Sequence, residues 1–206
     1  MVDTAQRSLP AALIDLPAHV AAHTLAHSSA SASAPAPDWL RVVPPAARFI
    51  LQGRAGVWAA AGVAWGVEFS EEPCRAIVKG DRATLWLGPD EYLLLDADAD
   101  NADAGAAALE RALTGIPHSL VDVSHRQIAL QLCGPYAATI LNGACPLDVD
   151  LAEFPVGMCT RTVFAKADIV LWRTEADTFH VEVWRSFAAY VTGLLYEIAR
   201  EFGSQA

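Results

Sequence analysis

Residues 121–135 read VDVSHRQIALQLCGP, and they lie between two stretches of sequence that resemble each other. In each stretch an apolar strand is followed by a short helix, further strands and an amphipathic helix. The pair Leu85-Trp86 of the first stretch recurs as Leu171-Trp172 in the second. Internal similarity of this kind indicates a duplicated unit, and two copies are too few for a solenoid. The sequence therefore predicts one pseudo-symmetric domain.

Each copy is predicted to have the order β-α-β-β-β-α, the first at about residues 47–115 and the second at about 118–202. The strand predicted over Ser119–Ser124 opens the second copy, and Ser186 is predicted to cap its final helix over Phe187–Phe202. Two such units predict an α+β fold with mixed or antiparallel sheets and with helices packed outside.

The first 38 residues differ from the rest of the chain, so we place the domain at residues 39–206. Leu9–Leu16 is predicted to be a short apolar anchor, and Ser28–Pro37 has the small, Pro-rich composition of a flexible linker. A segment of this composition is not expected to adopt an ordered structure by itself, and it is suited to lying across the surface of a partner.

Three histidines of the N-terminal arm recur every four residues, at His19, His23 and His27. On a helix they share one face, a spacing that can hold a metal ion. The alternative is a polar face on an Ala-rich arm, which needs no ligand.

Composition limits the function classes. The 206 residues are 53% hydrophobic, which is typical of a packed globular protein, and no apolar run approaches the roughly 18 residues that a membrane helix needs. The net charge of −10 argues against binding to nucleic acid or to an anionic membrane, because phosphate recognition requires a positive field. The N-terminus lacks the basic and apolar regions of a secretory signal, so we expect a cytoplasmic protein.

The cysteines show no CxxC spacing, which predicts reduced thiols that mostly serve as small buried hydrophobic residues. They are Cys74, Cys133, Cys145 and Cys159. A zinc site built from Cys145 and Cys159 with a distant histidine finds no support in the spacing.

The segment VDVSHR contains Asp122, Ser124 and His125, the residue types of a nucleophilic triad. Successive side chains of a strand point to opposite faces, so Ser124 and His125 do not easily meet, and the chain has no GxSxG turn. The favoured interpretation is that Asp122 and Ser124 bind neighbouring backbone groups while His125 and Arg126 occupy a turn.

Four arginines are predicted at strand edges or ends of the second copy, namely Arg126, Arg161, Arg173 and Arg185. They are suited to pairing with carboxylates of a partner or with a bound anion, although internal salt bridges or plain exposure remain open for each. Trp184 beside Arg185 resembles an interface anchor, because both residue types are enriched at binding hot spots. A core tryptophan next to a surface arginine gives the same pattern.

The sequence shows no phosphate-binding loop, because GRAGVWAAAG lacks the glycine spacing of a dinucleotide fingerprint. It also shows no metal cluster and no defensible pair of catalytic carboxylates. We therefore predict no catalytic, cofactor-binding or metal-binding residue on this chain.

Six motifs follow one another from about Arg48 onward, namely WLGPDEYLLL, VDVSHRQIALQLCGP, CPLD, FPVGMCTRT, VLWR and VEVWRSFAAYV. In this order they resemble the gamma subunit family of heterotetrameric sarcosine oxidases. That family resembles, more distantly, the folate-binding domain of glycine-cleavage aminomethyltransferases, which share a D-[LV]-S-H segment. Here Ala167-Asp168 and FPVGMCTRT stand where those proteins carry ligand-binding motifs, which argues against folate binding by this chain.

The resemblance implies an accessory subunit of a cytosolic oxidase that demethylates sarcosine to glycine. It implies FAD, FMN, NAD and tetrahydrofolate sites on the larger subunits, zinc on the smallest, and no cofactor on this chain. The implied partners are the alpha, beta and delta subunits, chiefly alpha. Two alternatives are a stand-alone folate-binding, aminomethyltransferase-like protein, with a central pocket lined by Arg126, Asp168 or Arg173, and a homodimeric scaffold.

Overall fold

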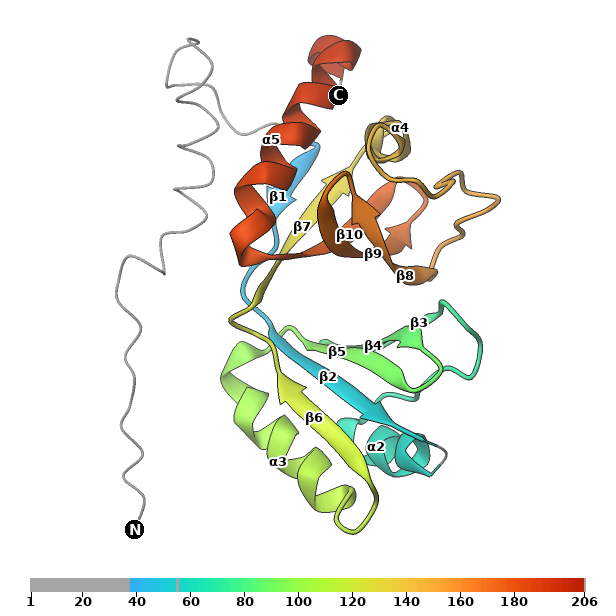
Figure 1. Ribbon diagram of the computed structural model, residues 1–206, viewed down its shortest axis with the longest axis vertical. Coiled ribbons are helices and arrows are strands. Elements are labelled where there is room, and N and C mark those ends of the chain that lie inside the picture. Colours follow the sequence, from blue (N-terminus) through green and yellow to red (C-terminus); the bar gives the residue numbers. More distant parts are fainter. Residues whose placement is uncertain (1–37, 55, 206) are drawn as a thin grey trace.

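The computed structural model describes residues 38–54 and 56–205 (Figure 1). The first half contains β1 (Leu40–Val42), β2 (Ala47–Gly53), α2 (Val57–Trp65), β3 (Ala76–Lys79), β4 (Arg82–Gly88), β5 (Glu91–Asp96), η2 (Ala99–Asn101) and α3 (Ala102–Ala112). The second half contains β6 (His118–Asp122), β7 (Gln127–Cys133), α4 (Ala137–Asn142), β8 (Cys159–Phe164), β9 (Ala167–Glu175), β10 (Thr178–Trp184), η3 (Arg185–Phe187), α5 (Ala188–Ala199) and η4 (Arg200–Gln205). The predicted apolar anchor, histidine face and linker lie outside the described residues.

The strands form two five-stranded antiparallel sheets. The first sheet has the order β3-β4-β5-β2-β6, and the second has the order β1-β7-β10-β9-β8. Leu85 pairs with Leu93 in the first sheet, and Leu171 pairs with Val181 at the equivalent place in the second. The predicted duplication and the α+β class are therefore confirmed.

The two halves exchange their first strands. β1 precedes the first half but pairs with β7 of the second sheet, whereas β6 precedes the second half but pairs with β2 of the first sheet. The repeating unit is thus β-β-α-β-β-β-α rather than the predicted β-α-β-β-β-α. The sequence pattern did not reveal β1, because its three residues, LRV, are too few to show an alternation.

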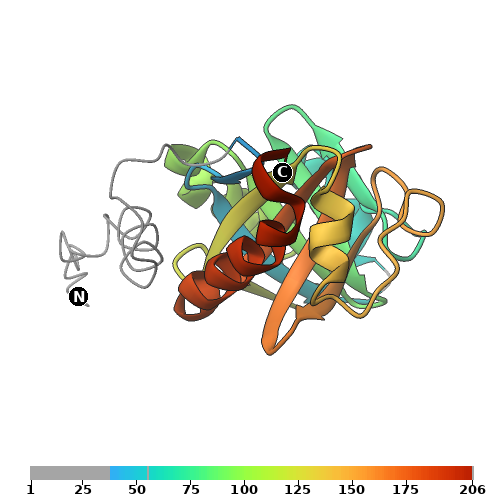
Figure 2. The ribbon, with the colours of Figure 1, turned by 90° about the horizontal axis from the view of Figure 1, so that it is seen from above.

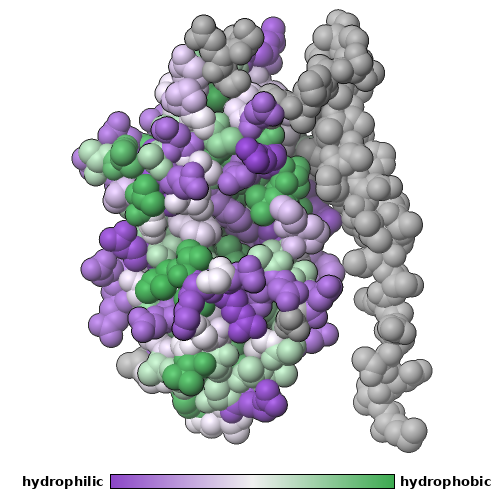
Figure 3. All heavy atoms as spheres, turned by 180° about the vertical axis from the view of Figure 1, so that it is seen from behind, coloured by the Kyte–Doolittle hydropathy of each residue, from purple (hydrophilic) through white to green (hydrophobic). Residues whose placement is uncertain are grey.

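The sheets lie face to face with helices outside them, which gives four layers (Figures 1 and 2). α2 and α3 cover the first sheet, and α4 and α5 cover the second. Each helical layer encloses a separate hydrophobic cluster, and a third cluster, which includes Leu85, Leu93 and Val170, fills the space between the sheets. On the face shown in Figure 3, the remaining hydrophobic residues form separate patches among hydrophilic ones.

Backbone hydrogen bonds and ion pairs join the sheets directly. At their β3 and β8 edges, the Ala76 backbone N–H donates to the Gly157 oxygen and the Cys159 N–H donates to the Cys74 oxygen, each at 2.8 Å. The ion pairs Arg48–Glu182 and Arg161–Glu91 also connect facing strands, as described below. The halves are therefore held in a fixed relation by contacts between specific residues, in addition to the exchanged strands.

Trp65 anchors the helices on the first sheet. Its side chain is fully buried, its ring meets Phe49 edge to face at 6.0 Å, and the Arg82 guanidinium lies 4.6 Å from the ring centroid. A Cβ at Gly105 of α3 would lie 3.0 Å from Trp65 Cζ3. Glycine at this position therefore lets α3 approach the tryptophan closely.

The start of α5 differs from the prediction. Residues 185–187 form the short 3₁₀ turn η3, and Phe187 occupies the N-cap of α5 with no side-chain cap hydrogen bond. The prediction that Ser186 caps this helix is wrong. Burial of Ala188, Val191 and Leu195 along one face stabilises the helix instead.

Candidate functional site

A cleft of about 440 Å³ opens between the two sheets. The segment that links β6 to β7, where the quoted sequence VDVSHR lies, forms part of its wall. The cleft is lined by Ile50, Gln52, Leu87, Glu91, Val121, Val123, Arg126, Gln127, Arg161, Asp168, Ile169, Val170 and Trp184. Because strands from both sheets contribute to it, the duplication itself creates this cleft.

A buried charged network links the sheets beside the cleft. Arg48 Nε of β2 lies 2.7 Å from Glu182 Oε2 of β10, and the two side chains are 3% and 0% exposed. His180 Nε2 lies 2.8 Å from the other oxygen, Glu182 Oε1. A buried pair of this kind is sensitive to the loss of either partner, because the remaining charge has no water to solvate it.

Burial disfavours the charged form of Glu182, but the hydrogen bonds and charges of His180 and Arg48 outweigh it and hold the pKa of the carboxyl below its ordinary value. The sequence analysis did not find this network. Glu182 alternates with Val181 and Val183, a pattern that predicts a solvent-facing position. The other sheet covers that face instead.

This lowered pKa predicts a pH-dependent stability. A carboxyl whose folded pKa lies below the unfolded value of about 4.3 stabilises the fold above that pH and loses its contribution as the pH falls further. We expect the wild-type chain to exceed Glu182→Gln in urea midpoint at pH 7, and the difference to shrink below about pH 4.3. A difference that stays constant from pH 7 to pH 3 would contradict the assignment.

The turn between β6 and β7 engages Asp122 and Ser124 as predicted. Ser124 Oγ donates to Asp122 Oδ1 at 2.6 Å and accepts a hydrogen bond from the Arg48 backbone N–H at 2.9 Å. The Ser124 N–H also donates to Asp122 Oδ1, at 2.8 Å. The interpretation of these two residues as turn-forming is confirmed. The serine hydroxyl is directed at a carboxylate rather than at His125.

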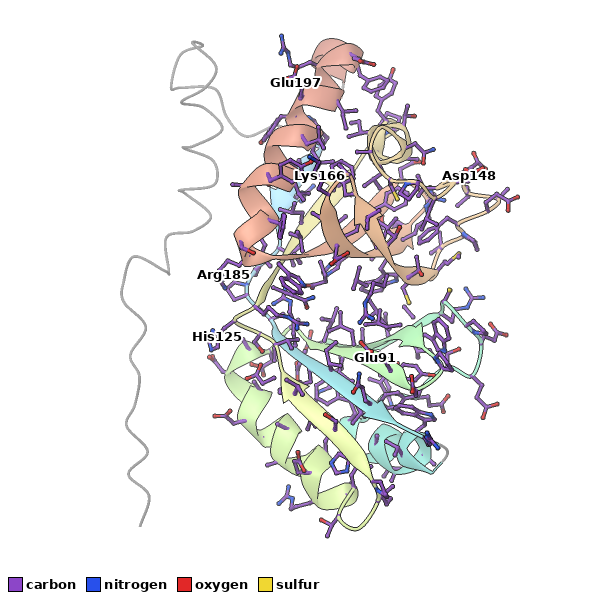
Figure 4. All side chains as sticks on the ribbon, viewed as in Figure 1. Glu91, His125, Asp148, Lys166, Arg185 and Glu197 are labelled. Carbon is purple, nitrogen blue, oxygen red and sulfur yellow. The ribbon has the colours of Figure 1, made fainter. Side chains whose placement is uncertain are left out.

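The four predicted arginines lie in three different places. Arg126 and Arg161 line the cleft: the Arg126 guanidinium lies 5.2 Å from the Trp184 ring centroid, and Arg161 forms an ion pair with Glu91 across the two sheets. Arg185 Nε donates to the His125 backbone oxygen at 3.2 Å, and the two residues lie near each other at the junction of the halves (Figure 4).

Arg173 lies elsewhere. It is 2% exposed in the interior of β9, its Nη1 donates to the Phe154 oxygen at 2.7 Å, and its guanidinium lies over the Phe179 ring. Burial lowers the pKa of its guanidinium. Arg173 is therefore buried near the end of β9 and is not among the residues that line the cleft, whereas Arg126 and Asp168 are.

Trp184 is 41% exposed, so it is not the core tryptophan of the alternative interpretation. Val121 at the cleft is 48% exposed, and Phe187 and Tyr190 nearby in sequence are 38% and 41% exposed. Large apolar side chains that gather at one place on a surface are typical of interaction sites.

The cysteines are all free, and no group of three or more metal-ligating side chains occurs among residues 38–54 and 56–205. Cys159 is fully buried at the β8 edge, and burial raises the pKa of its thiol to about 12. Its sulfur lies 3.5 Å from the Trp86 backbone oxygen.

Alkylation should therefore distinguish the cysteines of the folded chain. We expect iodoacetamide at pH 8 to label the half-buried Cys74 and Cys133 at least about tenfold faster than Cys159, because the thiolate is the reacting form. Peptide mass spectrometry over a time course measures this ratio, with the urea-unfolded chain as the control. Equal rates in the folded chain would show that the β8 edge opens readily.

A family model described as "Sarcosine oxidase, gamma subunit family" matches residues 52–201. The chain belongs to the sarcosine oxidase gamma subunit family. The sarcosine oxidase gamma subunit of Corynebacterium sp. strain U-96 is 34% identical over 155 residues, which cover 74% of this chain and 71% of that one. The gamma subunit of strain P-1 is 32% identical over 123 residues, which cover 60% and 59%.

Two solved structures have a similar fold. A chain of the heterotetrameric sarcosine oxidase from Corynebacterium sp. U-96, solved with pyrrole 2-carboxylate, superposes with a TM-score of 0.75 at 30% identity, covering 90% of this chain and 94% of that chain. The glycine cleavage system aminomethyltransferase T of Bartonella henselae gives a TM-score of 0.59 at 17% identity over 78% of this chain and 46% of that one. The latter similarity is one of fold alone.

Proposed function

We propose that this chain is an accessory, non-catalytic gamma subunit of a heterotetrameric sarcosine oxidase. The observation that carries the proposal is membership of the gamma subunit family, together with superposition on a heterotetramer chain over 90% of this chain. The complex demethylates sarcosine oxidatively to glycine, and flavin-bearing partner subunits perform the chemistry. FAD, FMN, NAD and tetrahydrofolate bind to the complex, and none of them binds to this chain.

The geometry supports a structural role. Two pairs of polar groups near the junction of the halves bind each other: Arg48 with Glu182, and Ser124 with Asp122. An arrangement of this kind holds the two sheets in place and presents no activated nucleophile. None of the helices in the described part of the chain combines the length and apolar character that crossing a membrane requires. We place the complex in the cytoplasm.

The partners are the alpha, beta and delta subunits, chiefly alpha. The contacts that we propose lie at the junction, where His125, Arg126 and Trp184 are exposed and Arg185 is half-buried, together with the exposed Arg161 at the cleft. Tryptophan and arginine supply a large share of the binding energy in protein interfaces. Asp122 and Ser124 contribute by fixing the turn that carries His125 and Arg126.

Native mass spectrometry of the tagged chain, purified from its own host cells, tests the proposal. We expect an assembly with three different subunits and bound flavin, and the same sample should turn over sarcosine. A lone monomer or a homodimer without flavin would overturn the proposal. Binding of tetrahydrofolate to that lone chain would support the alternative of a stand-alone folate-binding protein, because the cleft includes Arg126 and Asp168.

A further inference from the structure

Gln127 provides an unsatisfied acceptor at the cleft. This residue of β7 is 5% exposed and lines the cleft, and its buried Oε1 accepts no hydrogen bond from the described residues. A buried acceptor without a donor costs about 1–3 kcal/mol. Gln127 Oε1 can therefore accept a hydrogen bond from a donor group of a molecule that enters the cleft.

The charges around Gln127 are unevenly paired. Arg161 is neutralised by Glu91, whereas Arg126, which lines the same cleft, forms no ion pair with any carboxylate in the described part of the chain. Its guanidinium lies over the Trp184 ring, which holds its planar fork at the cleft. Asp168 lines the cleft as well and forms no ion pair among the described residues, so the cleft offers one unpaired charge of each sign. The guanidinium of Arg126 is the group that can bind a carboxylate, with two parallel hydrogen bonds.

The cleft also presents apolar surface, and one of the strands that line it is the outermost strand of its sheet. Val121 and Trp184 line it and are 48% and 41% exposed. Val121 belongs to β6, the outermost strand of the first sheet, so one side of β6 pairs with no other described strand. An extended chain can add to such an edge through its backbone groups.

We infer that this cleft receives an extended segment of a neighbouring subunit that carries an aspartate or glutamate. A backbone N–H of the segment donates to Gln127 Oε1, its carboxylate binds Arg126, and an apolar side chain packs between Val121 and Trp184. A protein segment satisfies all three features together. The inference rests on the proposed function, because it names where the partner binds.

The test measures how much of each gamma variant enters the complete complex in the host, by affinity purification and native mass spectrometry. We expect Arg126→Glu and Trp184→Ala each to reduce the incorporated fraction at least about tenfold. Arg111→Glu on the exposed surface of α3 makes the same charge change away from the cleft, and it should incorporate like wild type.

Gln127→Leu separates binding from folding. It removes the unsatisfied acceptor at nearly constant volume, so the isolated chain should unfold at an equal or higher urea concentration than wild type. Incorporation should nevertheless fall, because the donor of the partner segment then loses its acceptor. A merely structural role of Gln127 would move both quantities in the same direction, which contradicts the inference.

Photo-crosslinking identifies the occupant, with p-benzoylphenylalanine in place of Val121. The expected product joins this position to an acidic segment of another subunit. The inference is overturned if the wild-type chain enters the complex but the cleft variants enter equally well, or if the crosslink joins only tetrahydrofolate or another small molecule. If the wild-type chain fails to join any flavoprotein, the proposed function fails as well, which distinguishes the two failures.

Discussion

Replacing Glu182 by alanine is expected to lower the free energy of unfolding of the isolated chain by about 3–5 kcal/mol. The substitution leaves the Arg48 guanidinium 3% exposed and without its carboxylate, between two sheets that exclude water. Urea denaturation followed by tryptophan fluorescence at pH 7 measures the change. The loss is large compared with the roughly 5–15 kcal/mol that stabilise a typical domain.

A double variant tests this explanation. Replacing Arg48 by methionine and Glu182 by leucine removes both charges, and we expect most of the lost stability to return, because apolar substitutes for a buried pair are often neutral or stabilising. The exposed pair Arg200–Glu197 provides a matched control, for which Glu197→Ala should cost less than about 1 kcal/mol. A similar small cost for Glu182→Ala would show that water reaches the buried pair.

Replacing Trp65 by alanine is expected to cost about 3–5 kcal/mol, because the change leaves a cavity in the core beneath α2 and α3. The ring is fully buried, and it contacts Phe49, Arg82 and the backbone at Gly105. Urea denaturation again provides the measurement.

Trp184→Ala is the matched control for Trp65→Ala, since Trp184 is 41% exposed. We expect it to cost the isolated chain less than about 1 kcal/mol while it weakens assembly. Equal losses for the two tryptophans would mean that Trp184 packs in the core of the free chain and is not an interaction residue.

The fold class could be predicted because the duplication produces similar local sequence patterns in the two halves. The recurring Leu-Trp pair and the alternation of strands and helices identify the repeating unit. The exchange of β1 and β6 could not be predicted, because apolar alternation specifies that a segment is a strand without specifying which sheet it joins. Leu40 pairs with Leu132, far along the chain, and nothing near either residue indicates that pairing.

The site was predicted in part. The hydrogen bonds of Asp122 and Ser124 to neighbouring backbone groups could be predicted, because the preference of these residue types for turns depends only on the local sequence. The burial of Arg173 and Glu182 could not be predicted, for one common reason. A polar residue that alternates with apolar ones predicts a solvent-facing position, but in this four-layer fold both faces of each sheet are covered. The sequence of a single strand does not indicate which other layer will cover each of its faces.

The exchanged strands also set the order in which the chain can fold as it is synthesised. Four of the five strands of the first sheet lie between residues 47 and 96, and β6 completes that sheet at Asp122. β1 leaves the ribosome before any of them but must wait for β7, roughly 90 residues later. During that interval its backbone groups have no partner strand. An unpaired strand can pair with another nascent copy, so rapid translation or crowding of ribosomes on one message should favour β1-swapped dimers.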